Sequence, residues 1–426
     1  EEVDAIHPGI GFLSESPHYA RICREHGFNF VGPRVANMYR MGNKSNAIAT
    51  ARNLNIPVVP GSEGALMDPV HAMGVAAEIG FPVLIKAAHG GGGKGIEVVK
   101  EAGRFKSIFS RMFQEALSAF GNGDLYLEKF VGSMRHLEVQ IIRDMHGNSK
   151  LLGIRDCSVQ RNYQKLIEET ASGIPKNIKE QVFDYAGKLI DEIDYIGAGT
   201  VEFIYDLDQK CVYFMEMNTR LQVEHPVTEE ITGIDLVREQ IRIAAGEKLS
   251  LKQDDINING HSIECRIYAE DGFRDFIPSV GTIHELTLPE GPGIRFDHGM
   301  RAGMEITPYY DPLLGKLIVH DKTRNMSLRR MERALRECSI SGIATTVPFC
   351  SAVIKHLQFR EGNYTTSFVA DEMDNLRSSG KDGRSLLIAA AAAALHSYRI
   401  HSSSVHNSDN GTHPLWKQTG RQENLR

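Results

Sequence analysis

The chain has 426 residues, of which 42% are hydrophobic and 24% are charged; these are ordinary globular values that exclude disorder over most of the length. Its 48 Lys and Arg against 54 Asp and Glu give a formal net charge of −6, which lacks the basic signature of a protein that binds nucleic acid or an anionic membrane. The length allows two or three domains with sizeable cores.

The six cysteines never stand in C-x-x-C spacing, which indicates reduced thiols rather than a disulfide framework or a zinc site. We therefore expect a cytoplasmic protein, or one of the mitochondrial matrix if the source is eukaryotic.

The longest apolar run, Leu386–Leu395, is too short to cross a bilayer, so we expect a helix there. No signal peptide is recognised. We expect neither nucleic acid nor a membrane as a partner.

The chain opens with the pattern of a strand, a loop, a helix and a second strand. The strands are predicted over Val3–Ile6 and Phe28–Val31, and the helix begins after Ser16, a residue type that caps helices. One such unit cannot bury both faces of a parallel sheet. Because the chain also begins with Glu1 rather than Met, we expect that it was cut inside a domain and that partner strands, and any targeting segment, precede Glu1.

A helical linker is predicted over Val35–Asn55, and a compact α/β section follows it. That section comprises helix Pro69–Ile79, strand Pro82–Ala87, strand Ile96–Val99 and a long helix over Arg104–Ala119. Strands with intervening helices continue to about residue 369. Beyond that point Ser, Asn, His and Gly dominate outside the alanine run, as in a linker or the start of a further domain.

A glycine-rich loop, His89–Gly95, joins the two strands of this section. Its formal match to G-x-G-x-x-G is weak, because a Rossmann turn must open a helix and a strand follows here. The loop does not match the Walker A motif either, since Lys94 is followed by Gly95 and not by Ser or Thr. We predict a glycine hairpin between antiparallel strands, able to close its N–H groups over phosphates, with Lys86 in reach of the same anion. A merely flexible turn is the alternative.

A second hairpin carries the most informative residues of the chain. Its strands are predicted over Gly199–Asp206 and Cys211–Asn218. Glu216 and Asn218 share one face of their strand, and Glu202 joins them if the register pairs even positions with even. Three oxygen ligands on one face suit Mg²⁺. The alternative is an exposed polar face.

With these motifs the chain resembles the biotin carboxylase family of the ATP-grasp superfamily, from Glu1 to about Ala370. The run Asn218–Glu229 is the most specific part of the resemblance. The motifs that carry it are His7–Glu15, Met41–Lys44, Lys86 with the glycine loop, Leu127–Lys129, Arg135–Gln140, Arg155–Arg161, Glu216–Glu229 and Glu264–Ile267.

The resemblance implies a fold of mixed α/β and α+β class. We expect a partial Rossmann-like subdomain with its linker over residues 1–43, an ATP-grasp domain over 44–243 and a mixed α+β biotin carboxylase C-terminal subdomain over 244–370. Residues 371–426 are expected to be a linker or the start of a truncated further domain.

The resemblance also implies roles for individual residues, with ATP, two Mg²⁺ or Mn²⁺ ions and carrier-bound biotin as ligands. The residues expected at ATP are Lys44, Lys86, Gly92, Gly93, Glu128, Lys129, Phe130, Val131, His136, Gln160, Glu202 and Glu216. The metal ligands are Glu202, Glu216 and Asn218. The bicarbonate pocket comprises Lys165, Arg220, Gln222 and Val223. Glu224 matches the general base, and Arg266 the group that faces the biotin ureido oxygen; with Lys165 and Arg220 they form the catalytic set.

The implied chemistry explains these residue types. Arg220 can clamp bicarbonate with a planar fork while Glu224 takes its proton. Attack on ATP gives carboxyphosphate, which releases CO₂ and a phosphate that deprotonates biotin, and Arg266 stabilises the ureido enolate. A structural ion pair is the alternative for the two arginines, and a satisfied core histidine is the alternative for His136.

Two positions depart from the family pattern. Ile10 stands where the family usually has Tyr, in the loop expected near biotin, and Tyr163 stands where His is common. Neither change removes a group assigned to the chemistry. Both motivate the alternative of a catalytically impaired assembly subunit.

The expected partners are a biotin carboxyl carrier protein or domain and a carboxyltransferase subunit, within a homodimer or a larger assembly. No Ala-Met-Lys-Met-like biotinyl site exists in the chain, so we expect the carrier on another protein or on a lost C-terminal domain. The segment His413–Lys417 is loosely similar to the region that follows this domain in acyl-CoA carboxylases of the propionyl or methylcrotonyl type. Pyruvate carboxylase is the alternative. A carbamoyl-phosphate synthetase is disfavoured by Glu264–Arg266 and by the loop His7–Glu15.

Overall fold

The computed structural model describes residues 3–87, 95–379 and 390–399. Its larger unit extends to Leu376, and a second unit begins at Arg377. Residues 390–399 are helical, which agrees with the helix predicted in the alanine run as far as residue 395; residues 386–389 lie outside the described part. Among the described residues, no helix combines the length and the apolar character that crossing a membrane requires.

The N-terminal part of the larger unit is the predicted strand–helix–strand motif. Strands β1 (Ala5–Ile6) and β2 (Asn29–Phe30) pair in parallel, and α1 (Pro17–Glu25) connects them. Ser16 caps α1, because its side-chain oxygen accepts a hydrogen bond from the Tyr19 N–H at 3.2 Å. The prediction is confirmed, with both strands shorter than expected.

The predicted helical linker is divided into two helices. α2 (Val35–Gly42) ends before Asn43, and α3 (Lys44–Asn53) begins directly after it. The Asn43 side chain accepts a hydrogen bond from the Asn46 N–H at 3.1 Å and so caps α3. Lys44, one of the residues expected at ATP, is therefore the first residue of a helix, and its side chain is exposed.

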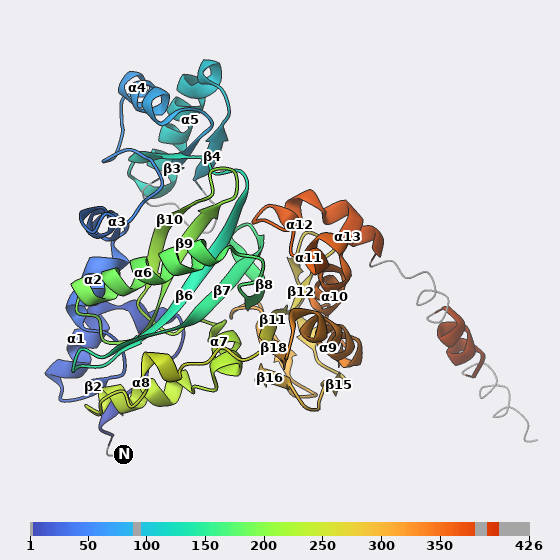
Figure 1. The fold of residues 1–426 in the computed structure, drawn as a ribbon. Helices are drawn as coiled ribbons and strands as arrows, with labels where there is room; N and C mark the ends of the chain where they lie inside the picture. Colours follow the sequence, from blue (N-terminus) through green and yellow to red (C-terminus); the bar gives the residue numbers. More distant parts are fainter. Residues whose placement is uncertain (1–2, 88–94, 380–389, 400–426) are drawn as a thin grey trace, which may run out of the picture. The chain divides into compact units, whose positions relative to one another are not determined.

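The glycine loop belongs to a three-stranded antiparallel sheet of order β4-β3-β5 that carries two helices (Figure 1). The bounds are α4 (Pro69–Ile79), β3 (Val83–Ala87), β4 (Ile96–Val99), α5 (Ala102–Phe120) and β5 (Leu125–Lys129). The predicted antiparallel pair of strands around the loop is confirmed by the β3–β4 register. Gly92, Gly93 and Lys94 lie outside the described residues.

An eight-stranded sheet of order β10-β9-β6-β7-β8-β11-β18-β16 forms the centre of the larger unit, and every neighbouring pair is antiparallel. The strands are β6 (Met134–Arg143), β7 (Ser149–Arg161), β8 (Gln164–Thr170), β9 (Gly197–Asp206), β10 (Cys211–Asn218), β11 (His261–Tyr268), β16 (Ile294–His298) and β18 (Leu313–Asp321). The associated helices are α6 (Lys176–Glu192), α7 (His225–Thr232) and α8 (Leu236–Ala244).

Strand β6 shows why this sheet can hold a polar site. Leu137, Val139 and Ile141 alternate toward a hydrophobic core that includes residues of α6. The intervening residues, His136 and Glu138 among them, point to the other face and are also buried. Buried polar side chains need hydrogen-bond partners, so the polar face of this strand must find its partners on other elements.

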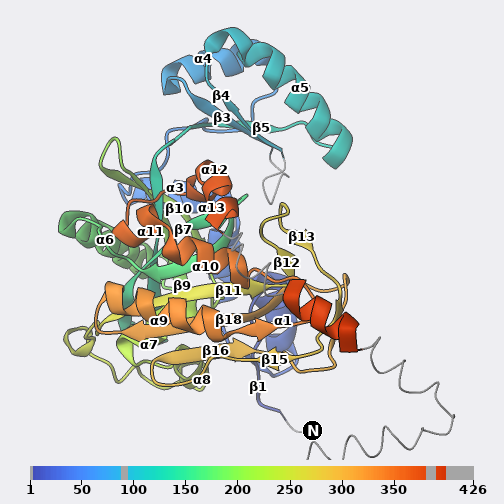
Figure 2. The ribbon, with the colours of Figure 1, turned by 90° about the vertical axis from the view of Figure 1, so that its right-hand side faces the viewer.

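Helix α9 packs on β11 and β18, α10 packs on α9 and α12 contacts β7; Figure 2 shows α9 and α10 in front of β11 and β18. The helices are α9 (Arg324–Glu337), α10 (Val347–Lys355), α11 (Leu357–Glu361), α12 (Phe368–Asp371) and α13 (Met373–Ser379). The short remaining elements are η1 (Phe12–Glu15), η2 (Gln253–Asp255), β12 (Glu270–Asp271), β13 (Ile277–Pro278), β14 (Gly281–Thr282), β15 (Leu286–Thr287), β17 (Glu305–Ile306) and β19 (Ser339–Ile340).

Candidate active site

A β-bulge in β10 sets the register of the predicted metal hairpin. Phe214 lies opposite Phe203, but the next pair is Glu216 with Glu202, so β10 carries one residue more than β9 at Met215. From this point on, even positions pair with even ones. The predicted face shared by Glu202 and Glu216 is therefore confirmed.

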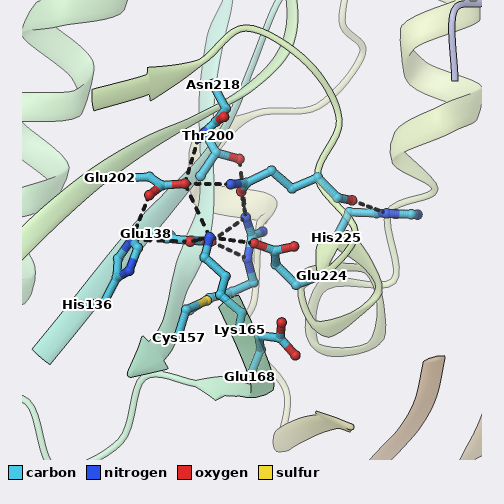
Figure 3. A network of polar contacts seen from close by, with 12 residues as sticks. His136, Glu138, Cys157, Lys165, Glu168, Thr200, Glu202, Asn218, Glu224 and His225 are labelled. Carbon is cyan, nitrogen blue, oxygen red and sulfur yellow. Dashed lines mark hydrogen bonds and ion pairs between the residues drawn. The ribbon is translucent and has the colours of Figure 1, made fainter. Parts of the chain in front are cut away.

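Glu202 is the most heavily bonded carboxylate of the hairpin (Figure 3). His136 Nε2 lies 2.7 Å from its Oε2. Its Oε1 accepts hydrogen bonds from Asn218 Nδ2 at 2.6 Å, from Gln222 Nε2 at 2.7 Å and from Lys165 Nζ at 3.3 Å. Burial alone would raise the pKa of Glu202, but the charges of Lys165 and His136 outweigh burial and hold it well below its usual range.

Glu216 is the carboxylate of the hairpin that lacks a strong partner. Lys44 Nζ lies 3.8 Å from its Oε2, with that lysine side chain 81% exposed. Burial, and then the like charge of Glu202, raise the pKa of Glu216. Glu216 is therefore short of positive charge beside a second carboxylate, an arrangement that fits a divalent cation with oxygen ligands. Asn218 Oδ1, the third predicted ligand, is close by but accepts a hydrogen bond from Arg220 at 3.0 Å.

Lys165 is surrounded by carboxylates. Its Nζ donates to Glu138 and, at 2.8 Å, to Glu224, in addition to Glu202. Burial would lower the pKa of Lys165, but these glutamates raise it well above its usual range. The lysine is therefore a fixed positive charge that links the predicted metal hairpin to the predicted general base.

Sequence reasoning assigned no role to Glu138 or Arg155, which lie at the centre of this network. Arg155 is fully buried and donates to Glu138 Oε2 at 3.1 Å and 3.2 Å, to Gln140 Oε1 at 2.7 Å and to Gln222 Oε1 at 2.6 Å. The alternation of His136, Glu138 and Gln140 along one strand is the signal that could have identified Glu138.

Glu224 lies between two cations. Its Oε1 accepts a hydrogen bond from Lys165 at 2.8 Å, and its Oε2 accepts one from Arg266 Nη2 at 2.9 Å. Burial would raise the pKa of Glu224, but Lys165 and Arg266 hold it well below the usual range. Glu224 is thus ionised at neutral pH, as a proton acceptor must be.

Arg266 also binds a second carboxylate, through a hydrogen bond of 2.5 Å from its Nε to Glu168 Oε1. Burial raises the pKa of Glu168 to about 7, against the opposing charge of Arg266. The structure therefore brings together Lys165, Glu224 and Arg266, which the sequence placed in one catalytic set.

Arg220 reaches the same site from the turn that follows β10. Its Nε donates to Glu15 Oε2 at 2.9 Å, and Glu15 also accepts from the Thr219 N–H at 3.0 Å. Through Asn218, Arg220 is connected to Glu202. Glu15, the last residue of η1, had no assigned role in the sequence prediction.

Among the residues expected at ATP, Glu128 and Lys129 lie on β5, His136 on β6 and Gln160 on β7. Lys86 forms an ion pair with Glu128 on the neighbouring strand. The N–H groups of Lys129 and Phe130 donate to the carbonyls of Pro60 and Pro82, so these two donors are already engaged within the protein.

Val131, two residues after β5, is buried, and the side chains of His136 on β6 and Gln160 on β7 contact each other. Gln160 Nε2 lies 2.8 Å from His136 Nδ1, while the other ring nitrogen contacts Glu202. Both histidine nitrogens therefore have protein partners, as expected for a satisfied buried histidine.

The two departures from the family pattern are exposed. Ile10 is in the loop before η1. Tyr163 follows Asn162 in the turn between β7 and β8. Both have positive φ angles, 47° at Asn162 and 67° at Tyr163. Such a pair matches a two-residue type I′ turn, a conformation that favours Asn and Gly over Tyr.

Three protein families match successive parts of the chain. Residues 1–38 match "Biotin carboxylase, N-terminal domain", residues 43–252 match "Carbamoyl-phosphate synthase L chain, ATP binding domain", and residues 264–371 match "Biotin carboxylase C-terminal domain". Biotin carboxylase 1 of Bacillus subtilis is 47% identical over 367 residues, which cover 86% of this chain and 82% of that protein.

Solved structures agree with this match. The biotin carboxylase domain of 2-oxoglutarate carboxylase from Hydrogenobacter thermophilus, a dimer in complex with MgADP, ADP and bicarbonate, aligns with a TM-score of 0.82 at 46% identity, over 87% of this chain and 82% of that one. Pyruvate carboxylase of Rhizobium etli aligns with a TM-score of 0.81 at 42% identity, over 88% of this chain and 34% of that longer one. This chain therefore belongs to the biotin carboxylase family, ligases of the ATP-grasp type that carboxylate biotin.

Proposed function

We propose that this chain uses ATP and bicarbonate to carboxylate carrier-bound biotin through carboxyphosphate, as the first half-reaction of an acyl-CoA carboxylase of the acetyl, propionyl or methylcrotonyl type. The observation that carries the proposal is the position of Glu224, ionised between Lys165 and Arg266. One carboxylate is thereby connected to the residues expected at bicarbonate and to the residue expected at biotin.

The first step is the activation of bicarbonate. Arg220 binds the anion with its guanidinium fork, next to Gln222 and Val223, and Lys165 adds a second positive charge. Glu224 takes the bicarbonate proton, and the resulting oxygen attacks the γ-phosphorus of ATP, with ADP as leaving group. A divalent metal held by Glu202 and Glu216 would neutralise phosphate charge during this transfer.

The second step is the transfer to biotin. Carboxyphosphate releases CO₂, and the phosphate left behind removes the proton from N1′ of biotin. Arg266 stabilises the negative ureido oxygen, and N1′ then attacks the CO₂ carbon to give carboxybiotin. Lys44 and Lys86, with the glycine loop, would hold the nucleotide phosphates.

The direct test measures ATP cleavage by the chain with Mg²⁺, bicarbonate and free biotin. We expect cleavage that requires bicarbonate and increases when biotin is added. A chain that binds Mg-ATP without such cleavage would instead be an assembly subunit, the reading that Ile10 and Tyr163 motivate.

The acceptor is decided by a second measurement. The carboxylated carrier, together with its carboxyltransferase, is offered acetyl-CoA, propionyl-CoA, methylcrotonyl-CoA, pyruvate and 2-oxoglutarate in parallel. We expect transfer to an acyl-CoA. The similarity to pyruvate and 2-oxoglutarate carboxylases makes a keto acid the second candidate. Partner carrier and carboxyltransferase chains, and a homodimer or larger assembly, belong to the same proposal.

A further inference from the structure

The turn between β10 and α7 has two consecutive backbone carbonyls held by buried side chains. His225 Nδ1 lies 2.8 Å from the Gln222 carbonyl oxygen, and because a carbonyl can only accept, this ring nitrogen carries the proton. Lys316 Nζ donates to the Val223 carbonyl at 2.8 Å. Burial, and then the charge of Lys316, lower the pKa of His225 to about 3, so the imidazole is neutral.

Holding these carbonyls also directs the amide groups of the turn. In a trans peptide unit the C=O and the next N–H point to opposite sides. Fixing the Gln222 carbonyl therefore fixes the N–H of Val223, and fixing the Val223 carbonyl fixes the N–H of Glu224. Within the described part of the chain, neither of these N–H groups donates to a protein acceptor. Adjacent backbone N–H groups without a protein acceptor are donors that can bind an anion.

Lys316 reaches the turn from a distant part of the chain, strand β18. It lies directly opposite Arg266 of β11, and the two side chains hold consecutive residues of the turn. Arg266 binds the carboxylate of Glu224, while Lys316 binds the carbonyl of Val223. The Lys316 side chain is only 10% exposed, and its other charged partner is Asp297 at 3.5 Å.

We propose that Lys316 is a positioning residue for bicarbonate, because its hold on the Val223 carbonyl keeps the N–H groups of the turn directed at the anion that Arg220 binds. The inference rests on the proposed function and adds a residue to the same site. Lys316 acts through the backbone, and within the described part of the chain its polar contacts are the Val223 carbonyl and the Asp297 carboxylate.

The test is a kinetic comparison of Lys316→Met with the unsubstituted chain. We expect the KM for bicarbonate to rise by about tenfold, the loss expected for a hydrogen bond to a charged donor, with the KM for ATP unchanged. Lys316→Arg, which retains a charged donor, should recover most of the affinity for bicarbonate. Lys322→Met, at an exposed lysine just after β18, is the matched control and should leave both constants unchanged.

Each outcome decides the proposal. An unchanged KM for bicarbonate, or an equal rise in both constants, would overturn it. If Lys316→Met shows no thermal stabilisation by Mg-ATP, Lys316→Gln, with a neutral donor, takes its place and should show a smaller rise of the KM for bicarbonate, again with the KM for ATP unchanged. Loss of folding in both variants would make Lys316 a structural residue only. Absence of bicarbonate-dependent ATP cleavage in the unsubstituted chain would instead contradict the proposed function, a result that needs no variant.

Discussion

Glu216 lies directly opposite Glu202 across β10 and β9, and one extra residue in β10, Met215, puts it there. Without the bulge Glu216 would lie opposite Val201, and its side chain would point into the hydrophobic core on the other face of the sheet. The proximity of the two carboxylates thus depends on a backbone irregularity, and their mutual repulsion provides a place for a cation.

Glu216→Gln should lower ATP turnover at least about a hundredfold, because metal stabilisation of the transferred phosphate is worth several kcal/mol. The melting temperature should not fall, since the substitution removes repulsion with Glu202. Turnover and thermal unfolding measured on the same preparation check both statements. Asp208→Asn, an exposed position in the same hairpin, is the control. Near-normal turnover in Glu216→Gln would remove this residue from the metal site.

Glu224→Ala should reduce bicarbonate-dependent ATP cleavage by about 10²- to 10⁴-fold, the contribution typical of a general base. It should also destabilise the fold, because Lys165 and Arg266 lose a buried partner. Glu224→Gln, similar in shape but without charge, should be equally inactive as a base. If either variant kept near-normal turnover at saturating bicarbonate, the proton acceptor would be another group.

Arg220 and Arg266 should differ in which activity they control. Arg266→Ala should suppress carboxylation of biotin far more than the ATP hydrolysis that occurs without biotin, because Arg266 is assigned to biotin alone. Arg220→Ala should depress both, since bicarbonate is no longer held. The measurement is ATP cleavage with and without biotin, beside carboxybiotin formation. Equal effects of both substitutions on both activities would contradict the division of roles.

Glu169 should stabilise the fold in a pH-dependent way. Burial would raise its pKa, but hydrogen bonds and charges from His261 and Arg324 lower it from 4.5 to about 2. Stability from this group is therefore fully present above pH 4.5 and is lost as the pH falls toward 2. Glu169→Gln should cost on the order of 3 kcal/mol at pH 7.

Denaturant unfolding of the two proteins at pH 7, 5 and 4 tests this expectation. The difference in the free energy of unfolding between the two proteins should shrink at the lowest pH. There the Glu169 carboxyl of the unfolded chain begins to bind a proton, while the folded one stays ionised. A difference that stays constant across the series would show that the contribution of Glu169 comes from packing and not from its charge.

Local patterns in the sequence predicted much of the fold. Helix Pro69–Ile79 and strand Cys211–Asn218 have the predicted bounds, because Pro at a helix start and β-branched or aromatic runs are strong local signals. The bulge at Met215 was not predicted. Tyr213 and Met215 are apolar like their neighbours, so nothing in the sequence marks the shift of register. The predicted domain boundaries at residues 43, 243 and 370 stay predictions.

The polar partners of the site were harder to predict than its strands. Glu15 binds Arg220 across a separation of 205 positions, and Lys316 reaches Val223 across 93. No local period or motif records such contacts, because they depend on how distant strands are ordered in the sheet. Arg155 differs, since its position opposite Glu138 follows once β6 and β7 are known to be neighbours.

The order of the large sheet has a consequence for dissecting the protein. Strands β8 and β11 are joined by only three residue pairs, Ile263 with Glu169, Glu264 with Glu168 and Cys265 with Ile167. A fragment that stops before β11 would leave β8 as an edge strand with a free row of N–H and C=O groups, which invites pairing with other chains. Such a fragment should aggregate rather than report ATP binding by itself, and it would also lack Arg266, which meets Glu168 of β8 across this seam.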